Sequence, residues 1–401
     1  MFSSLKFKVI LFGFIFTFFS SFGQSYFLGL FNSSIREALS ITHGQFGSIY
    51  ASATLCSSLL LIWVGKKIDD VNIFKFAFFV TILLSFACFF FSRVTSVFLL
   101  FIAIFLMRFS GQGMMSHTAS TTISRYFTKT RGRALSISWF GLSSAEFIMP
   151  VLMVYLLTII DWQNLWLIFS ISVLIILPIV SFLLIKNLNL DSREASDENI
   201  KHVEIKQWRR RDVLKDYRFY IISSNMLAMP WIFTGFAVFQ SFVQTSKGWG
   251  PYVIAQSFMS YSIFSVLTLF LSGFLIDKFT SRKLLIYMNI PLLLSVIVLF
   301  LFDTPITAFL FLGLVGISNG FANILGSSTW AELYGVKYLG SIKALTTALM
   351  VFATAFGTAL FGYLIDIGFT VGDIAIVSGT YIFISLILLF MVRKKLNPVI
   401  I

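Results

Sequence analysis

The sequence predicts an all-α membrane protein with twelve transmembrane helices in two pseudo-symmetric six-helix bundles. Of its 401 residues, 58% are hydrophobic and 12% are charged, whereas a soluble domain carries about a quarter charged residues. The apolar residues form long runs, each close to the roughly 20 residues that a helix needs to cross a bilayer. The runs fall into two sets of six around one polar stretch. This pattern excludes a soluble enzyme and a disordered chain, and the lack of alternation excludes an outer-membrane barrel.

The first apolar run follows a basic start, Met1 to Lys8, and continues to about Leu30. It is too long for a signal peptide and no cleavage site follows it, so we expect it to remain as the first span. The predicted spans are 9–31, 46–64, 76–92, 97–119, 134–159, 165–185, 217–243, 252–276, 284–302, 306–330, 342–365 and 373–392.

The polar stretch at 186–216 separates an N-terminal bundle, 1–185, from a C-terminal bundle, 217–401. Apolar residues recur within it beside a basic run, Arg209 to Arg211: Val203, Ile205, Trp208 and Val213. This predicts a cytoplasmic connector with a short amphipathic helix on a membrane surface that contains anionic lipids. Acidic residues interleave with the basic ones, so we expect no nucleic-acid partner.

The Lys and Arg residues predict the orientation, because cytoplasmic loops retain them. With a cytoplasmic N-terminus, nearly all of the 30 Lys and Arg residues fall on one side. The exceptions are Arg36, Arg93 and Lys247 on the other side and Arg108 within a span. Both termini are therefore predicted to be cytoplasmic, which also accounts for the net charge of +13.

Short motifs recur at matching places in the two halves. Gly-x-x-x-Asp follows the second span of each half, at Gly65 to Asp69 and at Gly273 to Asp277. After the fourth span, a Tyr is followed six residues later by a Gly: Tyr126 and Gly132, then Tyr334 and Gly340. These matches indicate a duplicated six-helix unit, the architecture of alternating-access transporters.

At these residues the sequence resembles the major facilitator superfamily, whose loop signature after span two is Gly-x-x-x-Asp-x-x-Gly-Arg-Lys/Arg. The second copy, Gly273 to Lys283, keeps the Gly, the Asp and a following Arg-Lys pair but lacks the second Gly, and the first copy keeps Gly and Asp but lacks the Arg. In the family this loop latches the halves together on the cytoplasmic side. The resemblance therefore implies gating roles for these residues: Gly65, Asp69, Gly273, Asp277 and Arg282.

Further segments sharpen the resemblance. Arg108-Phe-Ser-Gly-Gln112-Gly is similar to the family's Arg-x-x-Gln-Gly signature in span four. Arg131 to Ala134 and Ala331 to Gly335 resemble the branch that contains monocarboxylate transporters and oxalate/formate exchangers. The resemblance implies a monomeric secondary transporter in the cytoplasmic membrane.

Two ionisable residues lie near the middle of a span, where a charge costs roughly 2.5–3.5 kcal/mol on insertion scales. Arg108 is central in the fourth predicted helix and Glu146 in the fifth. These helices are antiparallel neighbours, so the two side chains are expected to reach the same depth. They form either a structural ion pair or a functional pair, in which Arg108 binds an anion and Glu146 carries a proton. Gln112, one turn from Arg108, offers a neutral hydrogen bond.

The resemblance also implies that the first, fourth, seventh and tenth helices line a central cavity. Their polar residues are the predicted lining: Gln24, Tyr26, Arg108, Gln112, Asn225, Gln240, Gln244, Asn319 and Asn323, with Tyr261 of the eighth helix as a further candidate. Hydrogen bonding between helices is the alternative role for each. As a set they describe a polar cavity with one fixed positive charge.

The resulting prediction is alternating-access transport of a small organic anion, such as a monocarboxylate, with proton coupling. Proton-driven efflux of drugs or metabolites is the first alternative, although Glu146 stands where the family's antiporter signature has glycines. A transporter-like nutrient sensor is the second. No nucleotide-hydrolysis motif occurs, and Cys56 and Cys88 lie within apolar runs. We therefore expect no enzymatic activity, cofactor or metal.

Overall fold

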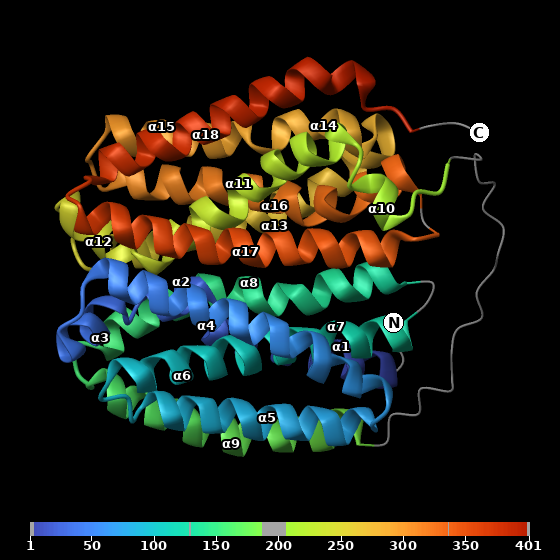
Figure 1. Ribbon diagram of the computed structural model, residues 1–401. Helices are drawn as coiled ribbons and strands as arrows, with labels where there is room; N and C mark the ends of the chain where they lie inside the picture. The colour runs from blue at the N-terminus through green and yellow to red at the C-terminus, as the bar shows by residue number, and fades with distance from the viewer. Residues whose placement is uncertain (1–3, 128–129, 187–205, 336, 399–401) are drawn as a thin grey trace. The chain divides into compact units, whose positions relative to one another are not determined.

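The structure is a computed structural model that describes residues 4–127, 130–186, 206–335 and 337–398. The chain divides into two compact units, Met1–Glu198 and Asn199–Ile401, here called the N-terminal and C-terminal units. The boundary falls inside the predicted connector. The described residues form helices and no strands (Figure 1), and twelve helices are long and apolar enough to cross a membrane. The predicted fold class is confirmed.

The N-terminal unit begins with a helix that is interrupted halfway. Its elements are α1 (Ser4–Ser20), η1 (Ser21–Gly23), α2 (Ser25–Gly29), α3 (Asn32–Leu39), α4 (His43–Val64), η2 (Gly65–Asp69), α5 (Ile73–Phe91), α6 (Val97–Met107), η3 (Arg108–Met115), α7 (Ser116–Tyr126), α8 (Arg131–Leu156) and α9 (Trp162–Ile185). The fourth span is the continuous run α6–η3–α7, in which η3 is a π-helix. Its main helix pairs are α1 with α8, α5 with α9, and α4 with α6.

The C-terminal unit has longer uninterrupted helices. Its elements are α10 (Arg210–Val213), α11 (Tyr217–Val238), α12 (Gln240–Ser246), α13 (Val253–Phe279), α14 (Ser281–Met288), α15 (Ile290–Leu301), α16 (Ile306–Tyr334), α17 (Leu339–Asp366), α18 (Val371–Val392) and η4 (Arg393–Lys395). Its main pairs are α13 with α16, α11 with α17, α15 with α16, and α15 with α18. Counted by span, three of these pairs, α11–α17, α13–α16 and α15–α18, correspond to the three named for the N-terminal unit.

One glycine contact repeats in both units. A Cβ atom added to Gly141 of α8 would lie under 3.0 Å from the carbonyl oxygen of Phe14 in α1. A Cβ atom added to Gly357 of α17 would meet the carbonyl oxygen of Trp231 in α11 in the same way. Small residues let neighbouring transmembrane helices approach closely. The first and fifth helices of each unit therefore pack through an equivalent glycine, which supports the duplication.

The end of the connector packs onto the C-terminal unit and contains one short helix. Val203 and Ile205 lie outside the described residues, and α10 is only four residues long. Val213 is fully buried in a hydrophobic cluster, against which Trp208 packs. The Trp208 amide donates to the Tyr334 carbonyl at 3.0 Å. Val213 is therefore buried within protein and Trp208 partly so, and the predicted amphipathic surface helix stays a prediction.

Candidate functional site

Two irregular helical segments meet in the N-terminal unit. The polar run from Ser20 to Ser25 interrupts the first span, and α1 gives way to η1 and α2 there. At Gly23, an added Cβ would lie under 3.0 Å from the backbone of Met107 and Gln112, and Gly111 is held equally close to Gly23. π-helical segments and broken membrane helices are frequent at functional sites, because their backbone groups leave the regular hydrogen-bond pattern.

Arg108 lies at this junction and is 3% exposed. Its Nη1 donates to the Gly23 carbonyl at 3.0 Å and to Ser25 Oγ at 3.3 Å. The guanidinium carbon stands 5.4 Å from the centre of the Tyr50 ring, a cation–π contact. The Tyr50 hydroxyl donates to Ser25 Oγ at 2.9 Å. All of these partners are neutral.

Ser25 and Tyr50 are site residues that the sequence reasoning missed. Ser25 ends the polar run that breaks the first span, so this run was the available signal. Tyr50 lies in α4, on the second span, and nothing in its local sequence distinguishes it from the other tyrosines. Its place beside Arg108 follows from the packing of α4 on the fourth span.

Glu146 lies in α8 and is 8% exposed. The expected ion pair with Arg108 is not formed: among the described residues, the Glu146 carboxylate has no hydrogen-bond or ion-pair partner. Arg108 turns toward the broken first span instead. Tyr26 of α2 lies near Glu146 and is itself 2% exposed.

The remaining predicted residues of the N-terminal unit surround the same junction. Gln24 has an extended backbone between η1 and α2 and is half-buried. Gln112 is half-buried in η3, and its backbone nitrogen faces Gly23. The structure therefore gathers Gln24, Gln112 and Arg108 where the first and fourth spans touch.

In the C-terminal unit, Asn319 and Asn323 of α16 line one pocket of about 200 Å³. Asn319 Nδ2 donates to Ser265 Oγ of α13 at 2.9 Å. α11 contributes Met226 and Phe233 to its lining, and α17 contributes Met350. The predicted pair on one face of the tenth span is thus found at a cavity.

The other residues of the C-terminal unit that were predicted to line the cavity are not among those that line this pocket. Asn225 is fully buried and its Nδ2 is 3.5 Å from Ser385 Oγ of α18, an arrangement of helix packing and not of cavity lining. Gln240 Nε2 donates to the Ala237 carbonyl at 2.9 Å and borders a separate cavity of about 20 Å³. Gln244 is half-buried in α12. Tyr261 is 2% exposed and stacks on Phe233, with ring centres 4.9 Å apart.

The two signature loops differ in their contacts. The side chains of Asp69 and Asp277 lie outside the described part of the structure. His117 Nε2 donates to the Gly65 carbonyl at 3.0 Å, so this histidine is a packing residue between spans. A Cβ atom added to Gly273 would meet nothing within 4 Å, so no close helix contact requires a glycine there.

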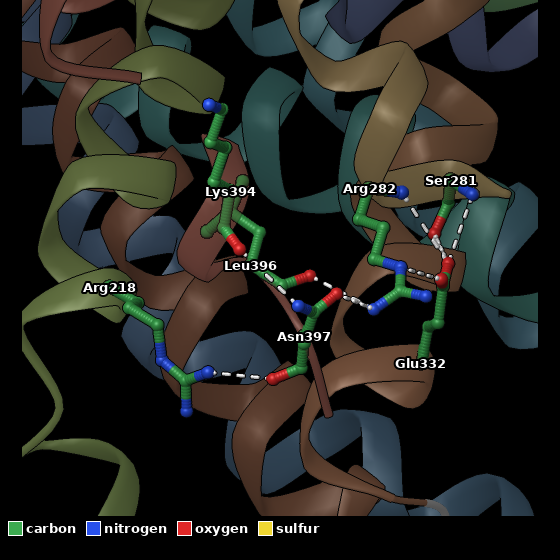
Figure 2. A network of polar contacts seen from close by, with 7 residues as sticks. All are labelled: Arg218, Ser281, Arg282, Glu332, Lys394, Leu396 and Asn397. Atoms are coloured by element: carbon green, nitrogen blue, oxygen red, sulfur yellow. Dashed lines mark hydrogen bonds and ion pairs between the residues drawn. The ribbon is translucent and has the colours of Figure 1, made fainter. Parts of the chain in front are cut away.

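Arg282 organises a polar network at one end of the C-terminal unit (Figure 2). Its Nε lies 2.8 Å from Glu332 Oε1 of α16, and Glu332 Oε2 also accepts the backbone N–H of Ser281 at 3.0 Å. Arg282 Nη1 donates to the Leu396 carbonyl at 3.1 Å and to Asn397 Oδ1 at 2.7 Å. Arg218 of α11 donates to the Asn397 carbonyl at 2.8 Å. All of these contacts join elements of one unit.

Comparison with known proteins agrees with this architecture. The sequence profile of the Major Facilitator Superfamily matches residues 13–357. A crystal structure of a bacterial homolog of the human lysosomal transporter Spinster, in an inward-facing, unoccupied conformation, shares 13% identity with a TM-score of 0.76, over 99% of this chain and 98% of that one. The nucleoside transporter NupG shares 16% identity with a TM-score of 0.70, over 98% of this chain and 99% of that one. The curated proteins contain no match. The chain therefore belongs to the Major Facilitator Superfamily and is a multi-pass membrane transporter.

Proposed function

We propose that the protein transports a small organic anion by alternating access, with Arg108 as the anion anchor and a proton as the coupling ion. We place it as a monomer in the cytoplasmic membrane with both termini in the cytoplasm, where its basic loops face anionic lipids. A monocarboxylate is the proposed substrate type, since segments of the chain resemble that branch of the family.

The observation that carries the proposal is the uncompensated charge of Arg108. The guanidinium is buried, and its partners among the described residues are a carbonyl, a hydroxyl and an aromatic ring. A buried charge is expensive unless it is paired. An anionic substrate would supply the missing negative charge, and a carboxylate fits the planar donor fork of arginine.

Glu146 is proposed as the proton carrier. Its carboxylate is buried in a transmembrane helix without a cationic partner among the described residues. Intramembrane carboxylates of this kind commonly form proton relays in transporters. Glu146 also lies near Tyr26, in the second half of the broken first span.

The test is uptake of labelled monocarboxylates, dicarboxylates, sugars and amino acids into proteoliposomes, with and without a pH gradient. We expect Arg108→Gln to reduce anion uptake at least about 100-fold, because a paired buried charge contributes about 3–5 kcal/mol. Arg108→Lys should retain part of the activity, since it keeps the charge without the fork. Arg36→Gln is the matched control, because Arg36 bonds to Asn32 of its own helix at 2.8 Å, away from the site.

Unchanged anion uptake by Arg108→Gln would disprove the anchor. Glu146→Gln should remove the stimulation by a pH gradient while substrate exchange at equal pH continues. Export driven by an inward proton gradient would instead indicate the efflux antiporter. Binding without uptake of any solute in the panel would indicate a sensor.

A further inference from the structure

The guanidinium of Arg108 has one nitrogen that is bound to the protein and two that are not. Nη1 donates to the Gly23 carbonyl at 3.0 Å and to Ser25 Oγ at 3.3 Å. Nε is buried and has no hydrogen-bond partner in the described part of the chain, and Nη2 makes no hydrogen bond or ion pair there. Because the donors of arginine are held in a rigid planar fork, the unused donors lie on the edge formed by Nε and Nη2.

This unused edge is suited to a planar anion. Two parallel N–H bonds from an arginine to the two oxygens of a carboxylate form the bidentate arrangement that is both strong and geometrically specific. Arg108 is 3% exposed, so water does not fully replace the missing partner, and a buried donor without a bond is costly. A spherical anion offers the charge but not the two oxygens, so the edge favours planar oxyanions.

Tyr50 holds the guanidinium through two contacts. The centre of its ring lies 5.4 Å from the guanidinium carbon, and its hydroxyl donates to Ser25 Oγ at 2.9 Å. Ser25 Oγ is also the oxygen that accepts the Arg108 Nη1 bond. Tyr50 is 1% exposed in α4, and close packing restricts its ring. The ring and the hydroxyl together keep Nη1 on the broken first span, which leaves Nε and Nη2 for a ligand.

We propose that Tyr50 is the positioning residue of the anion anchor, and that the substrate carboxylate binds to the Nε and Nη2 edge of Arg108. The assignment rests on the proposed function, which makes Arg108 the anchor. Tyr50 acts through Arg108 and Ser25, and it gives the site its preference for planar oxyanions over spherical ones.

The test variant is Tyr50→Phe, which keeps the ring and removes the hydroxyl. Ser25→Ala is the second variant, because it removes the oxygen that joins Tyr50 to Arg108. Tyr381→Phe is the matched control, since it loses a hydroxyl bond of 2.8 Å to the Ser224 carbonyl in the C-terminal unit. The melting temperature in detergent checks that each variant is folded.

The first measurement is calorimetric titration of purified protein with acetate and with bromide, and it does not depend on transport. We expect wild type and Tyr381→Phe to bind acetate at least about tenfold more tightly than bromide. Tyr50→Phe and Ser25→Ala should bind acetate about fivefold more weakly than wild type, which is the value of one hydrogen bond, and bromide within about twofold. Unchanged acetate binding by Tyr50→Phe, or an equal loss of both anions, would overturn the positioning role. Equal affinities of wild type for the two anions would overturn the proposed edge.

The second measurement is the rate of uptake into proteoliposomes for the labelled monocarboxylate that wild type transports best. Tyr50→Phe should raise KM about fivefold and leave Vmax within about twofold. Added to Arg108→Lys, the same substitution should change KM less than about twofold, because an ammonium group has no edge to orient. A fivefold change there as well would contradict the positioning role. If wild type takes up no carboxylate, the proposed function fails, and the titration still decides whether Tyr50 orients Arg108 for planar anions.

Discussion

The fourth spans of the two units occupy the same place in the repeat but differ in backbone and in charge. In the N-terminal unit this span, Val97–Tyr126, contains the π-helix and Arg108. In the C-terminal unit, α16 is an unbroken α-helix of 29 residues that carries Asn319 and Asn323. The duplicated scaffold therefore holds a charged site on irregular backbone in one unit and a neutral pocket on regular backbone in the other.

Glycine placement explains much of this difference. Gly316 and Gly320 are spaced by one helical turn, and both lie against the backbone of α13, so α16 packs closely without a break. In the N-terminal unit the close approach is between Gly111 and Gly23, and Gly23 itself stands in the interruption of the first span. The carbonyl of Gly23 is thereby available to Arg108.

The largest effect is expected for Gly23→Ala. The added methyl group would collide with the backbone of both Met107 and Gln112, where no flexible side chain can give way. Overpacking of this kind costs about 1–3 kcal/mol or more, and it would also displace the carbonyl that holds Arg108. We expect a lower melting temperature in detergent and at least about tenfold slower anion uptake. Gly132→Ala is the control, since its Cβ would meet nothing within 4 Å.

A smaller effect, equal in the two units, is expected for Gly141→Ala and Gly357→Ala. Each methyl group would meet a backbone carbonyl oxygen of the neighbouring helix, Phe14 in one unit and Trp231 in the other. We expect each variant to lose about 1–3 kcal/mol of stability, measured as a lowered melting temperature. A large loss in only one variant would show that the two units do not share this contact.

Much of the fold could be predicted from the sequence, because span number follows from the length of apolar runs and the bilayer sets that length. The duplication could be predicted from the recurring Gly-Asp and Tyr-Gly motifs. The position of Arg108 was also predictable, since a charge within an apolar run is conspicuous. The partners of Arg108 were not predictable, because they depend on the break at Gly23. This break turns a backbone carbonyl toward the fourth span, where Arg108 bonds to it. Glu146 is then left without a cation among the described residues.

The C-terminal pocket shows the same limit of sequence reasoning. Asn319 and Asn323 share a helix face by their spacing, so their joint exposure to a cavity could be expected. Asn225 looked equivalent to them by residue type and span, yet it is fully buried against α18. The rotation of a helix about its own axis decides whether a polar residue faces a cavity or a neighbouring helix. When a span is apolar on every side, its sequence does not reveal this rotation.

The smallest effect is expected at the signature loops. In the loop after α4, the contacts include a bond from His117 to the Gly65 carbonyl and one from Arg125 to the Ile68 carbonyl at 3.1 Å. The corresponding part of the C-terminal unit is held by the ion pair between Arg282 and Glu332.

Glu332→Gln should therefore destabilise the protein by about 1 kcal/mol, because the pair is partly exposed and an amide still accepts a hydrogen bond. Salt distinguishes the ionic part of this effect from lost packing, since screening weakens exposed charge pairs. Raising the ionic strength should lower the melting temperature of wild type toward that of the variant and change the variant little. Glu37→Gln, an exposed carboxylate of α3, is the control for the substitution itself. If the difference between wild type and Glu332→Gln persists undiminished at high salt, Glu332 stabilises this end of the unit through its hydrogen bonds to the start of α14, and the charge of its pair with Arg282 is not energetically important.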